Sequence, residues 1–464
     1  MEQPLPGTAQ FHRGLSRRDL LKSTACGFGS LAFSAVASQA APVVAPRAKR
    51  VIFLFMQGGP SQVDTYDYKP ELFQAHGKEV EFHVPRSRKR ENKPVMKPLW
   101  DFKRYGQCGR WSSSLFPEVA QHVDDLCFIH SMHTEGVAHG PATLFLHTGA
   151  TNLIRPSMGA WVSYGLGAEN ENLPAFVTVN PPANKGGPRN YSNAFLPAFH
   201  QGTVLGQPGN MSAPPEIRNL QSPLDSDTVL REHDFLDQLN RLQVGDSTNT
   251  VLDGVIRSHE LAWRMQTHAS EVVDIDRENR ATRDLYGIGN DTTDGFGRQC
   301  LAARQLAEAG VRFIQVSHCD NGSNPKWDQH SKMPKHEGLA QEVDRPIAGL
   351  LADLKRRGLL EDTLVWWGSE FGRTPFSQNN DGRDHNPRGF TTWLAGGGVK
   401  PGFAYGSTDE FGFAAVENKV HMHDLHATIL HALGLDHEKL TYSHAGRDFR
   451  LTDVHGRVVE EIFA

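Results

Sequence analysis

The amino-acid sequence predicts an α/β fold in which helices cover both faces of a mostly parallel central sheet. Short, continuously apolar runs recur along the chain, and each ends in a turn or in polar residues. Helical patterns with one apolar stripe lie between several of these runs. Strands that are apolar on both sides and alternate with helices are typical of parallel sheets buried between two helical layers.

The strongest helical patterns span 298–309, which Gly310 ends, and 338–357, which Gly358 follows directly. Pro346 lies inside the second pattern, and we expect it to kink or split the helix because proline removes a backbone hydrogen bond. The predicted strands cover 51–56, 126–129, 175–179, 311–316 and 363–367.

The composition excludes several classes of protein. The formal net charge of -5 gives no global basic field that would collect nucleic acid, so no nucleic-acid partner is expected. No apolar run approaches the roughly 18 residues that span a bilayer, so we expect no transmembrane span in the mature chain. The basic run at 86–90 has no interleaved aromatic residues and is predicted to be an exposed loop.

The N-terminus resembles a twin-arginine export signal. Arg17 and Arg18 precede a weakly apolar stretch over 24–37, and small residues before Ala40 suit a signal peptidase. We therefore expect a signal peptide over 1–40, recognition by the twin-arginine translocase, and delivery to the periplasm or outside the cell. The mature chain over 41–464 is predicted to be one domain, with an insertion or cap at about 183–297 that includes a helix near 251–268.

The cysteines of the mature chain leave two alternatives open. An oxidising compartment would permit two disulfides in any of three pairings, whereas buried free thiols are equally compatible with the apolar patterns around them. These cysteines are Cys108, Cys127, Cys300 and Cys319.

Polar side chains follow the predicted strands at the points where these strands end. In parallel sheets ligands bind outside the carboxyl ends of the strands, so we expect these residues to lie at one edge. They are His130 and His133, His318 and Asp320, and Glu370 with Arg373.

Three clusters of residues suit chemistry at such an edge. Asp328 and His330 offer oxygen and imidazole ligands, as Zn, Mn or Fe prefers, although such pairs also form structural hydrogen bonds. Glu370 would suit a metal ligand and Arg373 an anion clamp, unless the two form a salt bridge that holds a loop. Farther along the chain, 382–385 ends in an Asp-His pair that suits a general acid or a second ligand.

The third cluster is the start of an apolar helix that His139 begins and Gly149 ends. The free amide groups of a helix N-terminus stabilise anions. We therefore expect His139 to be a ligand, a base or a capping residue.

Several of these motifs together resemble the exported family called domain of unknown function 1501, which is similar to the alkaline phosphatase and sulfatase superfamily. The resemblance covers nearly all of the mature chain. The motifs are VIFLFMQGGPSQVDT from Val51, WDQH from Trp327, EFGRTP from Glu370, GRDH from Gly382 and DLHATIL from Asp424.

The resemblance implies an alkaline phosphatase/sulfatase-like fold and a set of metal ligands. Asp328 and His330 are similar to the late Asp and His of the superfamily, Glu370 falls where an Asp ligand follows a later strand, and His385 resembles a late His ligand.

The sequence also departs from the superfamily pattern. Gln57 stands where the first carboxylate is expected, which leaves Asp64 as the nearest substitute. His139 takes the place of the nucleophile, where such hydrolases have Ser, Thr or a modified Cys, and Phe371 replaces a ligand His. These departures favour a single-metal or metal-poor site over a two-metal site.

We therefore expect an exported hydrolase of small anionic phosphate or sulfate esters that uses one divalent cation, either Zn, Mn, Fe or Ca. Arg373 would clamp the anion, His139 would be a ligand or a nucleophile, and His385 would be catalytic as well as a ligand. The alternative is a non-hydrolytic binding or assembly protein with the same fold and a cell-surface partner. The expected metal ligands are Asp328, His330, Glu370, His385 and Asp64.

Overall fold

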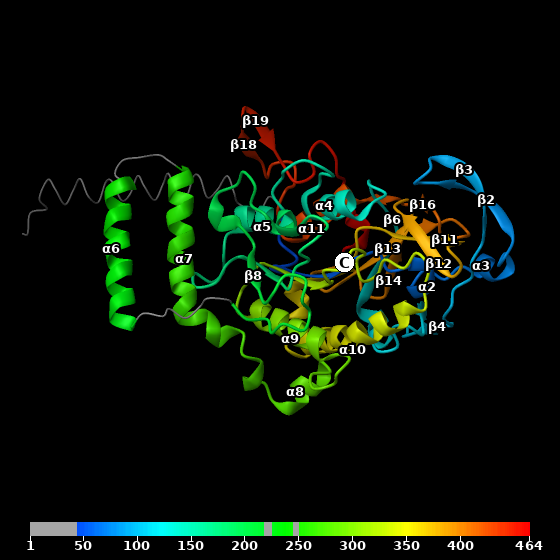
Figure 1. Ribbon diagram of the computed structural model, residues 1–464, viewed down its shortest axis with the longest axis horizontal. Helices are drawn as coiled ribbons and strands as arrows, with labels where there is room; N and C mark the ends of the chain where they lie inside the picture. The colour runs from blue at the N-terminus through cyan, green and yellow to red at the C-terminus, as the bar shows by residue number, and fades with distance from the viewer. Residues whose placement is uncertain (1–43, 218–224, 245–249) are drawn as a thin grey trace, which may run out of the picture. The chain divides into compact units, whose positions relative to one another are not determined.

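A central sheet organises the computed structural model, which describes residues 44–217, 225–244 and 250–464 (Figure 1). Within these ranges the sheet has nine strands, and every neighbouring pair is parallel except the two pairs that β13 makes. The strands lie in the order β14 (Phe403–Tyr405), β6 (Leu126–His133), β13 (Phe390–Ala395), β10 (Thr363–Gly368), β1 (Arg50–Met56), β9 (Phe313–His318), β7 (Phe176–Val179) and β8 (Thr203–Leu205), and β17 (Val420–His421) also pairs with β6. The predicted mostly parallel sheet is confirmed.

Both faces of the sheet are covered by helices, because each central strand is apolar on both sides. In β1, Leu54 belongs to the core beneath α9 (Asp294–Glu308) and α10 (Lys335–Arg356), while its neighbour Phe53 belongs to the opposite core. That second core packs under α4 (His139–Thr148), α5 (Met158–Leu166) and α11 (Met422–Ala432), which lie on the other side of the sheet in Figure 1. The predicted α/β class is therefore correct.

Most elements lie where the sequence places them, with exceptions in β6 and α10. The strand β6 does not end at residue 129 as predicted but continues through His133, so His130 and His133 lie within it. The helix α10 runs continuously through Pro346, so the expected split does not occur. The remaining described helices are α2 (Gln62–Thr65), α3 (Pro70–Gln74), α6 (Ser226–Val244), α7 (Thr250–Val272) and α8 (Arg280–Leu285).

Short hairpins flank the sheet. The basic run at 86–90 is exposed, as predicted, but only its first three residues lie in the turn between β2 (Glu79–Val84) and β3 (Lys89–Pro94), and its last two begin β3. The hairpin that matters for the site joins β11 (Gly372–Gln378) to β12 (Gly382–Asn386). The other pairs are β4 (Phe102–Tyr105) with β5 (Arg110–Ser113), β15 (Ser407–Thr408) with β16 (Ala415–Glu417), and β18 (Tyr442–His444) with β19 (Arg447–Phe449).

The segment over 183–297, expected as an insertion or cap, contributes β8 to the sheet and then forms α6, α7 and α8.

Of the described cysteines, none forms a disulfide, and burial raises the pKa of the Cys127 and Cys319 thiols to about 12. No helix in the described ranges combines the length and the apolar character that a bilayer span requires. The predicted signal peptide and its cleavage site lie outside the described residues.

Candidate metal centre

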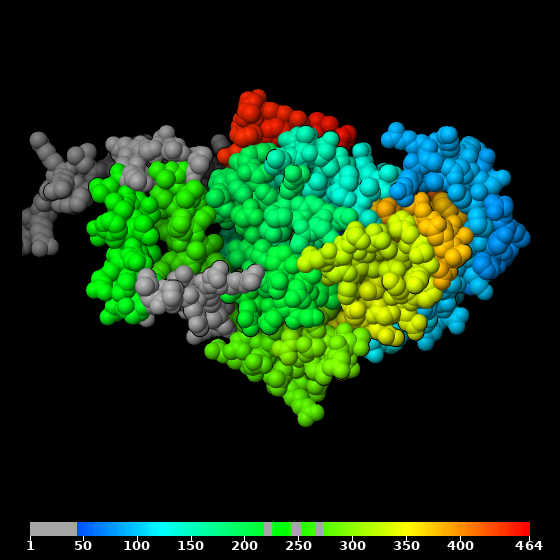
Figure 2. Space-filling model, viewed as in Figure 1, coloured from blue at the N-terminus to red at the C-terminus, as the bar shows by residue number. Residues whose placement is uncertain are grey.

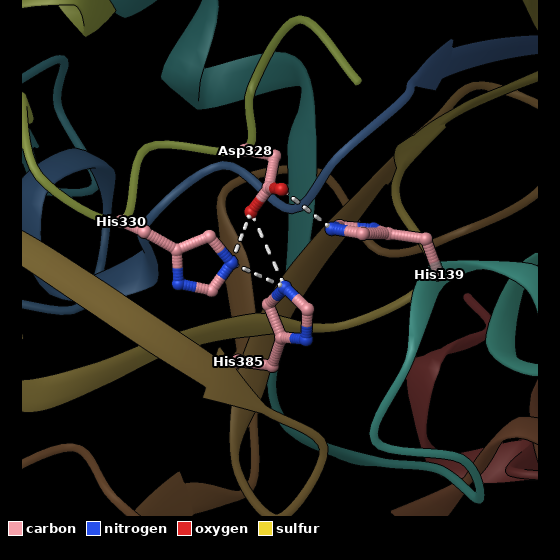
Figure 3. A group of neighbouring side chains, drawn as sticks. All are labelled: His139, Asp328, His330 and His385. Atoms are coloured by element: carbon pink, nitrogen blue, oxygen red, sulfur yellow. Dashed lines mark hydrogen bonds and ion pairs between the residues drawn. The ribbon is translucent and has the colours of Figure 1, made fainter. Parts of the chain in front are cut away.

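Four side chains from three separate parts of the chain converge at the carboxyl edge of the sheet (Figure 3). Each offers one ligand atom, and these atoms all lie within 4.8 Å of one another. His139 is the first residue of α4, Asp328 and His330 lie in the loop between β9 and α10, and His385 lies in β12. Figure 2 shows the yellow segment that contains this loop at the surface, between the cyan segment around α4 and the orange hairpin of β11 and β12.

The register of the central strands explains why these segments meet. Met56 at the end of β1 is the partner of His318 at the end of β9, and Phe55 is the partner of Gly368 at the end of β10. The loops that follow the three strands therefore begin at the same level. Glu370 follows β10 directly, as the sequence predicts.

Asp328 is the centre of the cluster. Its Oδ1 lies 2.9 Å from His330 Nε2 and 3.2 Å from His385 Nε2, and its Oδ2 lies 3.2 Å from His139 Nε2. Burial alone would raise the pKa of the Asp328 carboxyl, but its contacts with the three histidines and the positive charge of Arg373 outweigh burial and lower it well below its usual range. Asp328 is therefore a carboxylate.

The outer nitrogens of the three histidines are tied to oxygen acceptors. The Nδ1 atoms lie 2.6 Å from Glu370 Oε1 for His139, 2.5 Å from Gln378 Oε1 for His330, and 2.7 Å from the Val137 carbonyl for His385. Because a carboxylate or a carbonyl oxygen only accepts, each Nδ1 carries a proton in the neutral ring. The network thus assigns a lone pair to every Nε2, and each Nε2 faces Asp328.

The interior of the cluster therefore consists of acceptors, which repel one another unless a cation or a proton lies between them. His330 Nε2 and His385 Nε2 are 3.0 Å apart, and His139 Nε2 is buried without a well-aligned hydrogen bond. Ligands of a tetrahedral ion at bonds of about 2.0–2.1 Å are separated by about 3.3 Å. The distances from Asp328 to the histidine nitrogens and the distance between His330 Nε2 and His385 Nε2 are close to this value. The residues fit a divalent cation.

The pKa values of the two more buried imidazoles, His139 and His385, are shifted in opposite directions. Burial disfavours the charged form of His139, but its contacts with Asp328 and Glu370 outweigh burial and raise its pKa. Burial lowers the pKa of His385 to about 4. Of these two imidazoles, His139 therefore takes up a proton more readily than His385.

Glu370 was expected as a direct ligand, but the structure places it behind His139 and outside the cluster. Its side chain is completely buried, Oε1 accepts from His139, and Oε2 accepts from the Gly58 amide at 3.1 Å. Burial would raise its pKa, but the contact with His139 lowers it. A carboxylate in this position orients a ligating imidazole and increases its basicity.

Arg373 was expected to clamp an anion, but its guanidinium is buried and used within the protein. Nε donates to the Gly59 carbonyl at 2.9 Å, Nη1 donates to the Arg383 carbonyl at 3.3 Å, and Nη2 lies 2.8 Å from Asp328 Oδ1 and also contacts the Gly58 carbonyl. The salt bridge considered as an alternative, with Glu370, is replaced by this bond to Asp328. Arg373 therefore fixes Asp328 and the turn after β1.

Asp64 was expected as a substitute ligand, and the structure places it outside the cluster. Its carboxylate pairs with Arg383, with 2.7 Å between Oδ2 and Nε. Gln57 is buried as well, and its Nε2 donates to Asn184 Oδ1 at 3.2 Å while its Oε1 has no partner. Neither Gln57 nor Asp64 therefore brings a carboxylate into the cluster.

Two of the other predicted edge residues have structural partners. His318 is buried, with Nε2 at 2.8 Å from Glu342 and Nδ1 accepting from Trp327 Nε1 at 2.8 Å, so it holds the residue before Asp328. His130 lies inside β6, where its Nδ1 contacts the Thr391 hydroxyl at 3.1 Å. Neither is part of the cluster.

Phe371, which stands in place of a ligand histidine, packs its ring against two members of the cluster. Its centroid lies 4.9 Å from the ring of His139 and 4.5 Å from that of His385.

The sequence did not indicate two of the groups that contact the histidines, Gln378 and the Val137 carbonyl. Nothing in their spacing marks them, because β11 meets the loop of His330, and β12 meets the segment before α4, only in the folded chain.

The family comparison assigns the chain to one group of proteins. Residues 48–463 match the model described as "Protein of unknown function (DUF1501)", so the chain belongs to that family. The expected family membership is confirmed. No curated protein matches the sequence.

Several solved structures are similar to this chain at low identity. The phosphonate monoester hydrolase SpPMH from Silicibacter pomeroyi is 14% identical over 75% of this chain and 71% of that one, with a TM-score of 0.37. The PsFucS1 sulfatase from Pseudoalteromonas sp. is 13% identical over 84% and 69%, with a TM-score of 0.34. A protein in the alkaline phosphatase superfamily from Vibrio parahaemolyticus is 10% identical over 86% and 70%, with a TM-score of 0.36.

Proposed function

We propose that this chain is a metal-dependent hydrolase of phosphate or sulfate esters. One observation carries the proposal, namely the convergence of three imidazole lone pairs on the Asp328 carboxylate at the carboxyl edge of the sheet. The metal ligands would be His139, Asp328, His330 and His385. The resemblance of the motifs around Asp328 and Glu370 to the alkaline phosphatase and sulfatase superfamily supports the choice of substrate class.

The donor set narrows the choice of metal. Three imidazoles and one carboxylate suit Zn, Mn or Fe, whereas Ca²⁺ takes six to eight oxygen ligands. We therefore drop Ca from the metals expected from the sequence. A bound cation would polarise an ester oxygen and make an adjacent water molecule more acidic.

The chain's own residues would orient the ligands and the substrate. Glu370 holds the Nδ1 proton of His139, which leaves Nε2 available to a cation rather than to a substrate atom. We therefore propose His139 as a ligand and no longer as a nucleophile. The amide of Gly140 lies in the first turn of α4, and such amides lack intrahelical partners and favour anionic oxygens.

The cluster is open on one side, as a substrate would require. His330 is 23% exposed, and Val137 and Ala138 before α4 are exposed. Asp328 at the opposite side is only 3% exposed. An ester could thus approach past His330 while the carboxylate stays shielded from water.

Metal analysis of the purified protein followed by an assay with aryl phosphate and aryl sulfate esters tests the proposal. We expect about one Zn, Mn or Fe per chain and turnover of at least one ester class. His139→Ala should lose both the metal and the turnover. The control is His130→Ala, because His130 is a half-buried histidine of the same sheet whose ring stacks on Phe128 and contacts the Thr391 hydroxyl, outside the cluster. Wild-type protein that binds no divalent metal would overturn the proposal.

A second function, a binding or assembly protein at the cell surface, is favoured by the state of Arg373. Its nitrogens already donate to main-chain carbonyls and Asp328, so it is not available to hold an anionic ester. Metal-loaded wild-type protein that hydrolyses no ester in a broad panel would select this alternative.

We further propose that the chain is exported through the twin-arginine translocase, on the basis of the N-terminal sequence alone.

A further inference from the structure

We propose that the buried ion pair of Asp64 and Arg383 is a positioning device for the metal cluster, which sets the distance between the loop that carries His330 and the hairpin that carries His385. The inference rests on the proposed metal site. Both side chains are completely buried, with 2.7 Å between Arg383 Nε and Asp64 Oδ2 and 3.4 Å between Nη2 and Oδ1.

Arg383 joins the two ligand-bearing segments through its main chain. Its amide donates to the carbonyl of Gln329 at 3.1 Å, and Gln329 lies between the ligands Asp328 and His330. Two residues farther along β12 lies His385. A shift of Arg383 would therefore move one ligand directly and pull on the loop that holds two others.

The contact between these segments is too close to absorb such a shift. A Cβ atom built on Gly382 would lie 1.9 Å from the carbonyl carbon and oxygen of His330, so only glycine allows this approach. The backbones of the loop and the hairpin thus touch at the residue next to Arg383. Whatever holds Arg383 in place consequently holds the separation of His330 and His385, whose Nε2 atoms are 3.0 Å apart.

The guanidinium of Arg383 is held from three directions. Nη1 donates to the Thr374 carbonyl of β11 at 3.0 Å, and Nη2 donates to the carbonyls of Met96 and Lys97 at 3.2 Å. The remaining direction belongs to Asp64, which is the only carboxylate that pairs with Arg383 among the described residues. Removing the charge of Asp64 would leave a buried guanidinium without its counter-ion, which is strongly unfavourable.

Asp64 is in turn fixed to the end of β1. Ser61 Oγ donates to its Oδ2 at 2.5 Å, and the Leu99 amide donates to its Oδ1 at 3.1 Å. The turn before Ser61 contains Gly58, which donates to Glu370. The pair therefore connects the hairpin of His385 to the same turn that fixes the carboxylate behind His139.

Asp64→Asn tests the inference, with Asp353→Asn as the matched control. Asp353 is also completely buried and pairs with a buried arginine, Arg304, at 3.1 Å, but it lies on α10 and away from the cluster. We measure unfolding by denaturant, Co²⁺ affinity by competition with a chelator, and the visible absorption of bound Co²⁺, which reports the geometry of the ligands.

Both substitutions should lower stability, because both break a buried pair. Only Asp64→Asn should weaken Co²⁺ binding, by about tenfold or more as expected for residues that orient ligands, and change the visible spectrum. Ser61→Ala removes one hydrogen bond to Asp64 and should produce a smaller change in the same direction, and it serves as the test if Asp64→Asn does not fold. Wild-type affinity and spectrum in both variants, or an equal loss in Asp353→Asn, would overturn the inference. Wild-type protein that binds no Co²⁺ would instead overturn the proposed function.

Discussion

Glu370 Oε1 lies 2.6 Å from His139 Nδ1, and this contact turns the opposite nitrogen of the imidazole toward Asp328. The same carboxylate accepts from the Gly58 amide through its second oxygen. Both oxygens are therefore used as acceptors. Glu370, which the sequence suggests as a ligand, thus contacts the outer nitrogen of a proposed ligand, where a carboxylate orients the imidazole and increases its basicity.

Glu370→Gln should weaken metal binding by about 10–100-fold, as measured by competition with a chelator at constant pH. Glutamine has a single acceptor oxygen, so either His139 or the Gly58 amide loses its partner. Glu342→Gln is the matched control, because Glu342 contacts both His318 and Lys326 through one oxygen, which glutamine retains. Equal losses in the two variants would show that Glu370 has no special relation to the metal.

Asp328→Asn should release the metal and also destabilise the protein in chelator. Its carboxylate lies 2.8 Å from the buried Arg373 Nη2, and breaking a buried ion pair costs about 3–5 kcal/mol. Denaturant unfolding with and without chelator measures both effects. If the variant equals wild-type protein in chelator, the Asp328 contact with Arg373 contributes nothing to the apo fold.

Metal binding should weaken as the pH falls through the raised pKa of His139, because a proton and a cation compete for its Nε2. His385 should not compete until about pH 4. Without metal, the effect of pH on the stability of the folded protein has the opposite sign. Since the pKa of His139 is higher in the folded protein, its charged form stabilises the apo protein fully below the ordinary value of about 6.5. That stabilisation is lost as the pH rises through the raised value.

Chelator competition and denaturant unfolding in chelator, both measured between about pH 5 and pH 8, separate these two effects. Loss of the pH dependence of both quantities in His139→Ala would confirm the assignment. Metal affinity that does not change over this range in wild-type protein would contradict it.

Gly382→Ala should destabilise the protein by about 1–3 kcal/mol, because the new methyl group would overlap the His330 carbonyl and force the loop and hairpin apart. It should also lower metal affinity. Gly338→Ala, at an exposed position in α10 with nothing within 4 Å of the added carbon, is the control and should stabilise the helix by up to about 1 kcal/mol. Denaturant melts of both variants test the pair, and a neutral Gly382→Ala would refute the close contact.

Replacement of both Arg17 and Arg18 by lysine should leave an uncleaved precursor in the cytoplasm, because the arginine pair is the feature that the translocase reads. Cell fractionation followed by immunoblotting measures the precursor and the mature form. Replacing Arg47 and Arg50, a nearby pair outside the signal, controls for general effects of removing two arginines. Unchanged export of the Arg17 and Arg18 variant would remove the proposed route.

The sequence by itself determined the sheet and the segments from which the cluster is built. A continuous apolar run such as 51–56 can be satisfied only between two apolar layers, and β1 indeed contributes Leu54 to one core and Phe53 to the other. Asp328, His330 and His385 were identified because two short motifs, WDQH and GRDH, combine carboxylate and imidazole side chains. His139 was identified because it begins an apolar helix.

Only the tertiary structure decided what each polar residue does. Glu370, Arg373 and Asp64 are all suitable for a metal site by residue type, yet each is completely buried and bonded to a partner more than 40 positions away in the chain. Residue type gives the number of donors and acceptors, but burial requires each of them to find a partner, and the partner is chosen by which loops meet at the sheet edge. The meeting of these loops therefore determines which four residues form the cluster and which side chains hold those four in place.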